Sequence, residues 1–198
     1  MLDEFLRPLK DRVLLPLAMR LPFSPNTITL SAFFIGLCAV SASFLNFPYL
    51  AFVLWILNRI IDGLDGLVAR HTHTQSDFGG FLDLICDFFV YATLPSATMV
   101  GVIGTTEALY VAIAYLISFS LNSTCLFLVS ATLLKKEMAQ GSPTSVPLPT
   151  GYMEGAETIF AFSLMLAVPT YAVYTLSFFT VCIYATIVQR CVWSYRHL

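Results

Sequence analysis

Four aspartates between residues 62 and 87 are the side chains best suited to chemistry in this sequence. They are Asp62, Asp65, Asp83 and Asp87, and they stand in otherwise apolar sequence. An ionised carboxylate in hydrocarbon is costly unless it is paired or binds a metal ion. Two explanations are therefore open: the four residues bind cations and a substrate, or the segment does not lie in a membrane.

The composition favours a membrane. The chain has 198 residues, of which 58% are hydrophobic and 11% are charged, whereas about a quarter of the residues of a soluble domain are charged. Apolar runs cover residues 27–45, 49–70, 78–102, 108–134, 152–168 and 171–195. Most approach the roughly 20 residues needed to cross the hydrocarbon core. We therefore expect an all-α polytopic membrane protein with six transmembrane helices and a single domain over residues 1–198.

Two further segments frame these runs. Residues 2–21 combine an apolar stripe with a basic face, a pattern typical of an amphipathic helix that lies in the membrane interface. Residues 135–149 are polar and rich in Pro, Gly and Ser, so we expect a loop there.

Lysine and arginine indicate the orientation. Basic residues precede the first run and follow the second, fourth and sixth, whereas the loops on the opposite side carry none. The positive-inside rule then predicts that both termini lie on the cytoplasmic side. The four aspartates lie close to the loop between the second and third runs, so we expect them on the same side.

Helix geometry brings the four carboxylates to similar depth. At 1.5 Å per residue, Asp65 and Asp62 lie about 7 and 12 Å inward from the end of their helix. Asp83 and Asp87 lie about 9 and 15 Å inward from the start of the next helix. Spacings of three and four residues place each pair on one helix face. We expect the four side chains to converge.

Charge and nearby small residues indicate the ligand. If ionised, the four carboxylates carry four negative charges, and Arg59 and Arg70 offset at most two of them. This balance predicts one or two divalent cations, and oxygen ligands select hard ions such as Mg²⁺, Mn²⁺ or Ca²⁺. Glycines alone would indicate close helix packing, but beside four acids we interpret Gly66 and Gly79 as leaving room for a ligand.

The same residues form a specific motif. Residues 62–87 match without departure the pattern D-x2-D-G-x2-A-R-x8-G-x3-D-x3-D. With this motif the sequence resembles the CDP-alcohol phosphotransferase (CDP-alcohol phosphatidyltransferase) family. The resemblance is strong over residues 58–88 and extends weakly to Pro25-Asn26-Thr27.

The resemblance implies a reaction and a set of roles. Such enzymes transfer a phospho-alcohol group from a CDP-alcohol to an acceptor hydroxyl and release CMP, with Mg²⁺ or Mn²⁺ as cofactor. Asp62, Asp65 and Asp83 would bind metal and pyrophosphate, and Asp87 would be a metal ligand and the catalytic base. Contacts to the CDP-alcohol are implied for Gly66, Arg70, Ser76, Gly79, Asn26, Thr27 and Thr29. The expected partners are a lipid donor, an alcohol acceptor, membrane lipid and a second copy of the chain, without nucleic acid.

The donor and the acceptor differ in how far they can be predicted. A chain without an extra soluble domain favours CDP-diacylglycerol as donor, by analogy with the small family members. Few cationic groups beyond Arg70 are available for a phosphorylated acceptor, so we favour an unphosphorylated hydroxyl compound. Lys135, Glu154 and Glu157 are candidates for acceptor binding, although acids at a helix start are also favoured by the helix dipole alone.

Other functions are compatible with acids in a membrane. A cation or proton transporter also uses intramembrane carboxylates, but it would carry them near the bilayer centre and on several helices. An intramembrane prenyltransferase has aspartate motifs of different spacing on a longer chain. Here the acids cluster on two consecutive helices near one face, which favours the transferase.

Overall fold

The computed structural model describes residues 14–16, 18–20, 22–139 and 155–197, and all regular elements in these ranges are helical. Beyond a short helical stretch near residue 15, the elements are α2 (Pro25–Phe44), α3 (Pro48–His71), α4 (Asp77–Ala97), the π-helix η1 (Thr98–Ile103), α5 (Thr106–Ala139), α6 (Gly155–Ala167), the 3-10 turn η2 (Pro169–Tyr171) and α7 (Ala172–His197).

Helices α2 to α7 correspond in order to the six apolar runs. Among the described residues, four stretches are long and apolar enough to cross a membrane: Pro25–Phe44, Asp77–Ile103, Thr106–Lys135 and Pro169–Arg196. Helix α3 is 24 residues long but carries the charged motif, and α6 has 13 residues. The chain is thus an all-α, multi-pass membrane protein, whereas the predicted count of six spans is not confirmed.

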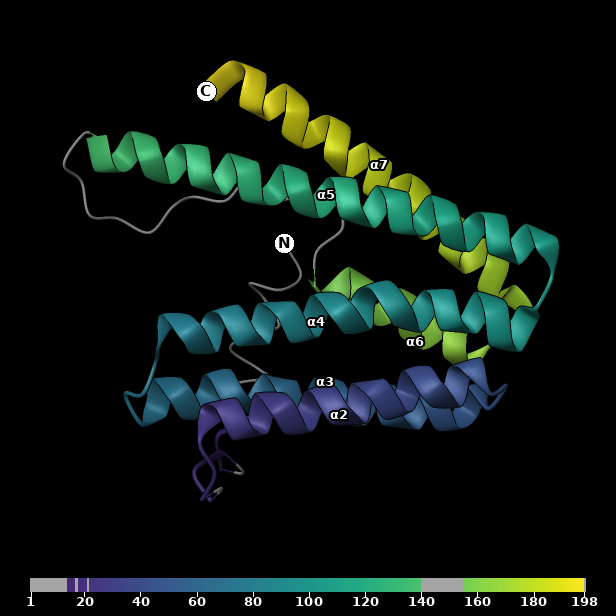
Figure 1. Ribbon diagram of the computed structural model, residues 1–198, viewed down its shortest axis with the longest axis horizontal. Helices are drawn as coiled ribbons and strands as arrows, with labels where there is room; N and C mark the ends of the chain where they lie inside the picture. The colour runs from purple at the N-terminus through teal and green to yellow at the C-terminus, as the bar shows by residue number, and fades with distance from the viewer. Residues whose placement is uncertain (1–13, 17, 21, 140–154, 198) are drawn as a thin grey trace.

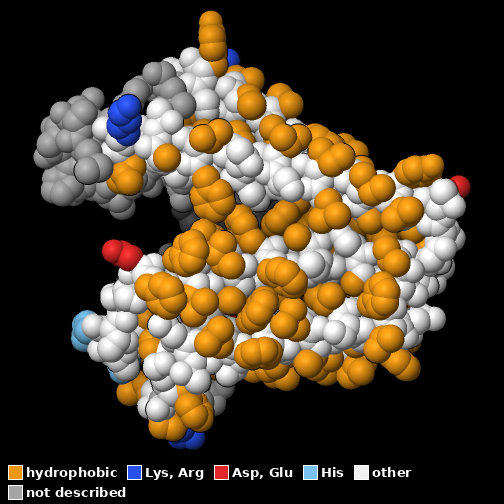
Figure 2. Space-filling model, viewed as in Figure 1, with side chains coloured by type: hydrophobic (Ala, Val, Ile, Leu, Met, Phe, Trp, Pro, Cys, Tyr) orange, Lys and Arg blue, Asp and Glu red, His pale blue; other side chains and the backbone are white. Residues whose placement is uncertain are grey.

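The helices form two groups joined by α6 (Figure 1). Helix α2 packs against both α3 and α4, and α5 packs mainly against α7. Helix α6 contacts α3 and α7, so it links the two groups. In Figure 2 hydrophobic side chains spread over the visible face, and the charged side chains lie at its two ends. This distribution fits a surface that is embedded in lipid.

Local sequence explains where the helices begin and end. Ser24 and Ser76 are the N-caps of α2 and α4, and their side chains accept hydrogen bonds from backbone N–H groups of the first turn. Between α2 and α3, Asn46 has a φ of 64°. Between η1 and α5, Gly104 has a φ of 66°, a conformation that glycine adopts without a steric penalty.

Helix α5 differs from its prediction. We expected it to end at residue 134 and a loop to begin at residue 135, but the helix continues to Ala139. Residues 135–139 have the sequence KKEMA, and all of these residues favour helices, so the polar character of the segment was misread as a loop. The remainder of the predicted loop lies outside the described residues.

The predicted interfacial helix over residues 2–21 lies mostly outside the described residues. Within the part that the structure describes, Leu14 and Ala18 pack against a small apolar cluster that α2 and α3 provide. The members of this cluster on the two helices are Ile28, Ile61, Leu64, Leu67 and Val68. The end of the N-terminal segment is thereby tied to the helix that carries the aspartate motif.

The core between the two helix groups is aromatic. Trp55 of α3, Tyr91 of α4 and Tyr115 of α5 each contact the ring of Phe162 of α6, with ring centroids 5.6–6.1 Å apart. Phe179 of α7 contacts the same ring at 5.7 Å. Aromatic pairs in such tilted and edge-on geometries stabilise a core beyond their buried area. One side chain of α6 therefore joins four other helices.

A close helix contact generates the first prediction. A methyl group at Gly101 of η1 would overlap the backbone carbonyl of Phe44 at the end of α2. Backbone atoms cannot move aside as a flexible side chain does, so Gly101→Ala should lower the thermal unfolding midpoint of the detergent-solubilised protein. Gly80→Ala is the matched control, because a methyl group there meets no atom within 4 Å. Equal midpoints for the two variants would contradict this contact.

Candidate active site

Three of the four motif aspartates converge. Asp62 of α3 and Asp83 and Asp87 of α4 each offer a carboxylate oxygen, and these three oxygens lie within 4.8 Å of one another. All three side chains are partly buried. The predicted convergence of the two helix faces thus holds for these residues.

An arginine compensates part of this negative charge. Arg59 lies one turn before Asp62 on α3, and its side chain is 7% exposed. Its Nη2 donates to Asp87 Oδ1 at 2.7 Å, and its Nη1 donates to Asp87 Oδ2 at 3.2 Å. The same Nη1 lies 3.4 Å from Asp62 Oδ2. The guanidinium therefore binds Asp87 through two nitrogens, and one of these nitrogens also lies close to Asp62.

Asp65 has a separate environment. Its side chain is buried, and its Oδ2 accepts a 2.6 Å hydrogen bond from the hydroxyl of Thr29 on α2. Its Oδ1 accepts a short hydrogen bond from the backbone N–H of Gly66. These two hydrogen bonds stabilise the ionised form of the carboxylate.

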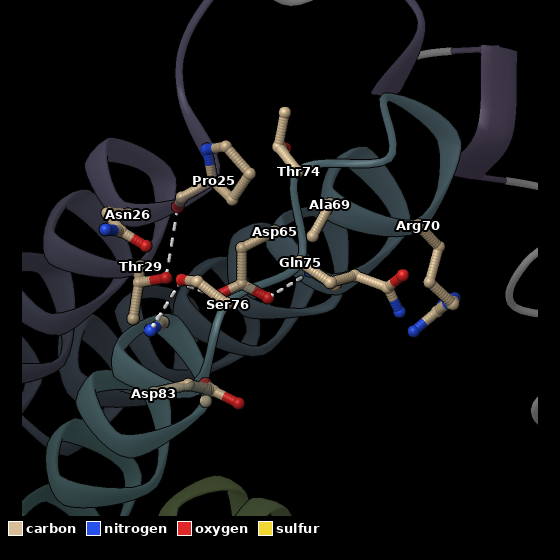
Figure 3. A pocket seen from close by; sticks show the side chains of 13 residues that line it. Pro25, Asn26, Thr29, Asp65, Ala69, Arg70, Thr74, Gln75, Ser76 and Asp83 are labelled. Carbon is tan, nitrogen blue, oxygen red and sulfur yellow. Dashed lines mark hydrogen bonds between the residues drawn. The ribbon is translucent and has the colours of Figure 1, made fainter.

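A cavity of about 270 Å³ lies next to the carboxylates. Figure 3 shows Arg70, Gln75 and Asp83 projecting toward a common open space, with Asp65 and Thr29 behind them. The cavity is lined by the ends of α2, α3 and α4 and by the loop between α3 and α4, through Pro25, Asn26, Thr29, Asp65, Gly66, Ala69, Arg70, Thr74, Gln75, Ser76, Gly79, Gly80 and Asp83. Asp83 belongs to both the cavity and the carboxylate cluster.

Glycines keep this space open. A methyl group at Gly79 would come within 3.0 Å of Asn26 Oδ1 and of Ser76 Oγ. A methyl group at Gly66 would lie 3.2 Å from Arg70 Nη1. Both approaches are tighter than ordinary contacts, so glycine at these positions lets the polar side chains point into the cavity.

The remaining predicted site residues are distributed differently. Thr27 is exposed, and its hydroxyl pairs with that of Ser24 at 2.8 Å, so it belongs to the start of α2 rather than to the cavity lining. Lys135 is exposed near the end of α5, and Glu157 is half-buried in the first turn of α6. Glu154 lies outside the described residues.

Several functional candidates escaped prediction from the sequence. Thr74 and Gln75 line the cavity from the eight-residue gap inside the motif, and that fixed gap is a signal that could have drawn attention to them. Tyr91 contacts Arg59 through its hydroxyl at 2.8 Å, and Asn58 accepts from Arg59 Nε at 2.7 Å. Their roles depend on packing between helices, for which the sequence gives no local signal.

Comparison with protein families identifies the chain. The model of the CDP-alcohol phosphatidyltransferase family matches residues 23–192. The chain belongs to this family. Family membership favours the transferase over the cation-transporter alternative, because the match covers most of the chain and not the motif alone.

Relatives in the family include both whole-length and partial matches. Inner membrane protein YnjF of Escherichia coli is 31% identical over 201 residues, covering 98% of this chain and 95% of that protein. The CDP-diacylglycerol–serine O-phosphatidyltransferase of Helicobacter pylori is 40% identical over 73 residues, covering 36% of this chain and 30% of that enzyme. The similarity to the Helicobacter enzyme is therefore limited to a segment of each chain.

Solved structures share the fold. The phosphatidylinositol phosphate synthase of Mycobacterium tuberculosis with CDP-DAG bound superposes with a TM-score of 0.73 at 16% identity, covering 93% of this chain and 94% of that one. The same synthase in complex with manganese and citrate gives a TM-score of 0.67 at 16% identity, covering 93% and 87%. The helix arrangement is therefore that of a known family enzyme.

The carboxylate cluster fits a hard divalent cation. Its three oxygens lie within 4.8 Å of one another, close to the separation of two ligands on opposite sides of an ion at roughly 2.0–2.6 Å. The donor atoms are all oxygens, which suits Mg²⁺ and Mn²⁺ better than softer metals.

The hydrogen bond between Thr29 and Asp65 generates the second prediction. Thr29→Val keeps the side-chain shape but removes a donor to a buried carboxylate. We expect a loss of about 1–3 kcal/mol in stability, measured as a lower thermal unfolding midpoint in detergent. Thr29→Ser should restore most of it. Thr132→Val is the control, because Thr132 is exposed and bonds only within its own helix to Leu128. Equal losses of stability in the two valine variants would contradict the stabilising role of the hydrogen bond between Thr29 and Asp65.

Proposed function

We propose that this protein transfers a phosphatidyl group from a CDP-alcohol, CDP-diacylglycerol in particular, to an acceptor hydroxyl and releases CMP. The observation that carries the proposal is the juxtaposition of the three-carboxylate cluster and the polar cavity, which share Asp83. A nucleotide diphosphate ester needs both features: a polar cavity for its head and a cation site for its pyrophosphate.

The cavity supports the assignment of the donor. Arg70 suits bidentate phosphate contacts, and Asn26 and Ser76 offer hydrogen-bonding groups for the cytidine or its phosphates. Gly66 and Gly79 let the donor approach the helix backbones. The cavity of about 270 Å³ is lined by polar side chains and suits a polar head group, so the acyl chains of the lipid would lie along the apolar helix surfaces.

The carboxylates would hold the cofactor, one or two Mg²⁺ or Mn²⁺ ions. Asp62, Asp83 and Asp87 form the cluster, and Asp65 adds a carboxylate on the cavity side. A bound divalent ion would neutralise charge on the pyrophosphate and orient it for in-line attack. The manganese complex of the structurally similar mycobacterial synthase supports this assignment.

Asp87 has the position for proton transfer. It lies one turn deeper along α4 than Asp83, which borders the cavity. The acceptor oxygen would attack the phosphorus that bears the diacylglycerol group, and the acceptor proton would pass to the Asp87 carboxylate. The bond between that phosphorus and the oxygen bridging to CMP breaks, and CMP leaves. Placement of the hydroxyl beside the carboxylate is the main requirement for this step.

The second half of the chain favours an unphosphorylated acceptor. The side chain of Arg190 is buried, and its Nη1 donates to Asn122 Oδ1 at 2.6 Å, which satisfies part of its hydrogen-bonding capacity inside the protein. Lys135 and Glu157 remain candidate contacts for a polar acceptor, as does Glu154. We infer that the acceptor is a small hydroxyl compound without a phosphate group.

Other expectations complete the proposal. The positive-inside rule places both termini and the active site on the cytoplasmic side. The whole chain would form one catalytic domain. Two copies would associate as a homodimer, in line with the family resemblance.

The reaction generates the third prediction. The purified protein with Mg²⁺ or Mn²⁺ should release CMP from CDP-diacylglycerol in the presence of the right alcohol, and a chelator should abolish release by removing the ion from the carboxylates. The measurement is CMP by chromatography and the lipid product by mass spectrometry, over a panel of phosphorylated and unphosphorylated alcohols. Absence of CMP with every acceptor would contradict the proposed function. A product formed only with a phosphorylated alcohol would contradict the acceptor assignment alone.

Asp87 generates the fourth prediction. Asp87→Asn keeps the size of the side chain but removes the proton-accepting charge. We expect nucleotide binding within a few-fold of wild type, and a loss of transfer of at least about a hundredfold, as is typical for general bases. Calorimetric titration with CDP and the CMP assay measure the two properties separately. Wild-type turnover by this variant would remove Asp87 from the role of base.

A further inference from the structure

The hydroxyl of Tyr91 is a polar group beside the carboxylate cluster to which the proposed reaction gives no role. Arg59 Nη1 donates a 2.8 Å hydrogen bond to Tyr91 Oη. The same nitrogen donates to Asp87 Oδ2 at 3.2 Å and lies 3.4 Å from Asp62 Oδ2. One arginine nitrogen therefore places the tyrosine oxygen next to two carboxylates of the cluster.

This contact determines how the tyrosine hydroxyl can be used. Arginine only donates hydrogen bonds, so Tyr91 Oη is the acceptor toward Arg59 and keeps its own O–H as a donor. Among the residues that the structure describes, no group accepts a hydrogen bond from this O–H. Tyr91 is partly buried, and a donor removed from water without a partner is costly. The hydroxyl is therefore suited to a ligand oxygen that arrives beside the cluster.

Packing fixes the ring that carries this hydroxyl. The Tyr91 ring lies edge-on to the rings of Trp55 and Phe162, with centroids 6.0 Å apart in both pairs. Tyr115 donates to the backbone carbonyl of Tyr91 at 2.7 Å. The guanidinium carbon of Arg59 lies 5.0 Å from the centroid of the same ring. The hydroxyl is thus held in place before a substrate binds, as a precise binding site requires.

The position of Tyr91 along α4 matches the side from which an acceptor would arrive. Asp83 borders the polar cavity, Asp87 follows four residues later, and Tyr91 follows four residues after that. Each step of four advances about 6 Å along the helix and keeps roughly the same side. Tyr91 therefore lies beyond Asp87 as seen from the cavity, where an in-line acceptor would stand opposite the leaving nucleotide. Figure 2 shows the molecule hollowed between the start of α4 and the end of α5.

A single oxygen atom can contact both Asp87 and Tyr91. Asp87 Oδ2 and Tyr91 Oη lie 3.2 and 2.8 Å from the same arginine nitrogen. An oxygen between them can therefore lie about 3 Å from each, which is an ordinary hydrogen-bond distance. A hydroxyl oxygen has one proton and two lone pairs. When its proton points to Asp87 and one lone pair to Tyr91, the second lone pair remains for the attack on phosphorus.

We propose that Tyr91 binds the acceptor alcohol, with its hydroxyl donating a hydrogen bond to the oxygen that attacks the donor phosphate. This inference rests on the proposed function, because it concerns the acceptor of the same reaction. The proton of the attacking oxygen passes to Asp87, and the tyrosine proton stays on Tyr91 throughout. Tyr91 thereby orients the attacking oxygen.

Tyr91→Phe tests this contact, because it keeps the ring and removes only the hydroxyl. The acceptor in the assay is the alcohol that gives the most CMP with the wild type. We expect kcat/KM for this alcohol to fall at least about tenfold, which corresponds to the loss of one hydrogen bond in the transition state. The KM for the donor and the affinities for CDP and Mn²⁺ should stay within about twofold of wild type, because the hydroxyl contacts neither ligand in this proposal.

The affinity for Mn²⁺ separates this role from a structural one. If Tyr91 only held Arg59, its loss would release a cation that pairs with Asp62 and Asp87, and Mn²⁺ binding would change together with the rate. An equal change in Mn²⁺ or CDP affinity, or an unchanged kcat/KM for the alcohol, would overturn the inference. Tyr110→Phe is the matched control and should behave as the wild type, because Tyr110 of α5 is 68% exposed.

A second measurement does not depend on the folding of the phenylalanine variant. Replacing Tyr91 by 3-fluorotyrosine keeps the hydroxyl and places a fluorine atom beside it. The ¹⁹F resonance should shift when the alcohol is added to protein that is loaded with Mg²⁺ and CDP, and no shift at a saturating concentration would overturn the inference. Equal transfer by the wild type and Tyr91→Phe would leave the proposed function intact and remove Tyr91 alone. Absence of CMP with every alcohol would overturn both.

Discussion

The acidic cluster exists only because its charge is compensated inside an apolar helix bundle. Ionised carboxylates removed from water are strongly destabilising unless paired and hydrogen-bonded. The two nitrogens of Arg59 on Asp87, and the approach of one of them to Asp62, compensate part of this charge. In the proposed reaction the carboxylates at the border of the cavity would attract a divalent ion, and that ion would bind the diphosphate of the donor.

The fold is arranged around this compensation. Trp55 and Tyr91 face Arg59 with their rings and at the same time contact Phe162 in the core. Tyr115 of α5 donates to the backbone carbonyl of Tyr91 at 2.7 Å, so the second helix group also supports α4 at this level. The charged site and the aromatic core are therefore adjoining layers of one structure, and packing far from the cavity controls the geometry of the carboxylates.

Periodicity predicted the part of the site that depends on single helices. Spacings of three and four residues on consecutive antiparallel helices were enough to bring Asp62, Asp83 and Asp87 together. The same spacing did not reveal that the Asp65 carboxylate is held by Thr29. That contact joins α3 to α2. No local sequence pattern indicates which of two nearby polar groups a side chain will bind.

The helices show the same division between local and tertiary information. The caps at Ser24 and Ser76 are local features, because an N-cap depends on a few consecutive residues. The extension of α5 to Ala139 was missed because charge was taken as a sign of a loop, although KKEMA favours a helix. The sequence places Arg59 inside an apolar run, but its partners Asn58, Tyr91 and Asp87 emerged only from the contacts of α3 with α4 and from the hydrogen bond of Asn58 to α2.

The relative depth of two aspartates indicates from which side the acceptor would approach in the proposed reaction. Asp83 borders the cavity, and Asp87 follows four residues later, about 6 Å deeper at the rise of an α-helix. A donor whose nucleotide fills the cavity would present its phosphates at Asp83. The acceptor hydroxyl must then approach from the side of Asp87, opposite the leaving nucleotide, as in-line displacement requires. The guanidinium of Arg59 pairs with Asp87, so in this proposal it would border the space that the acceptor enters and hold the carboxylate that receives its proton.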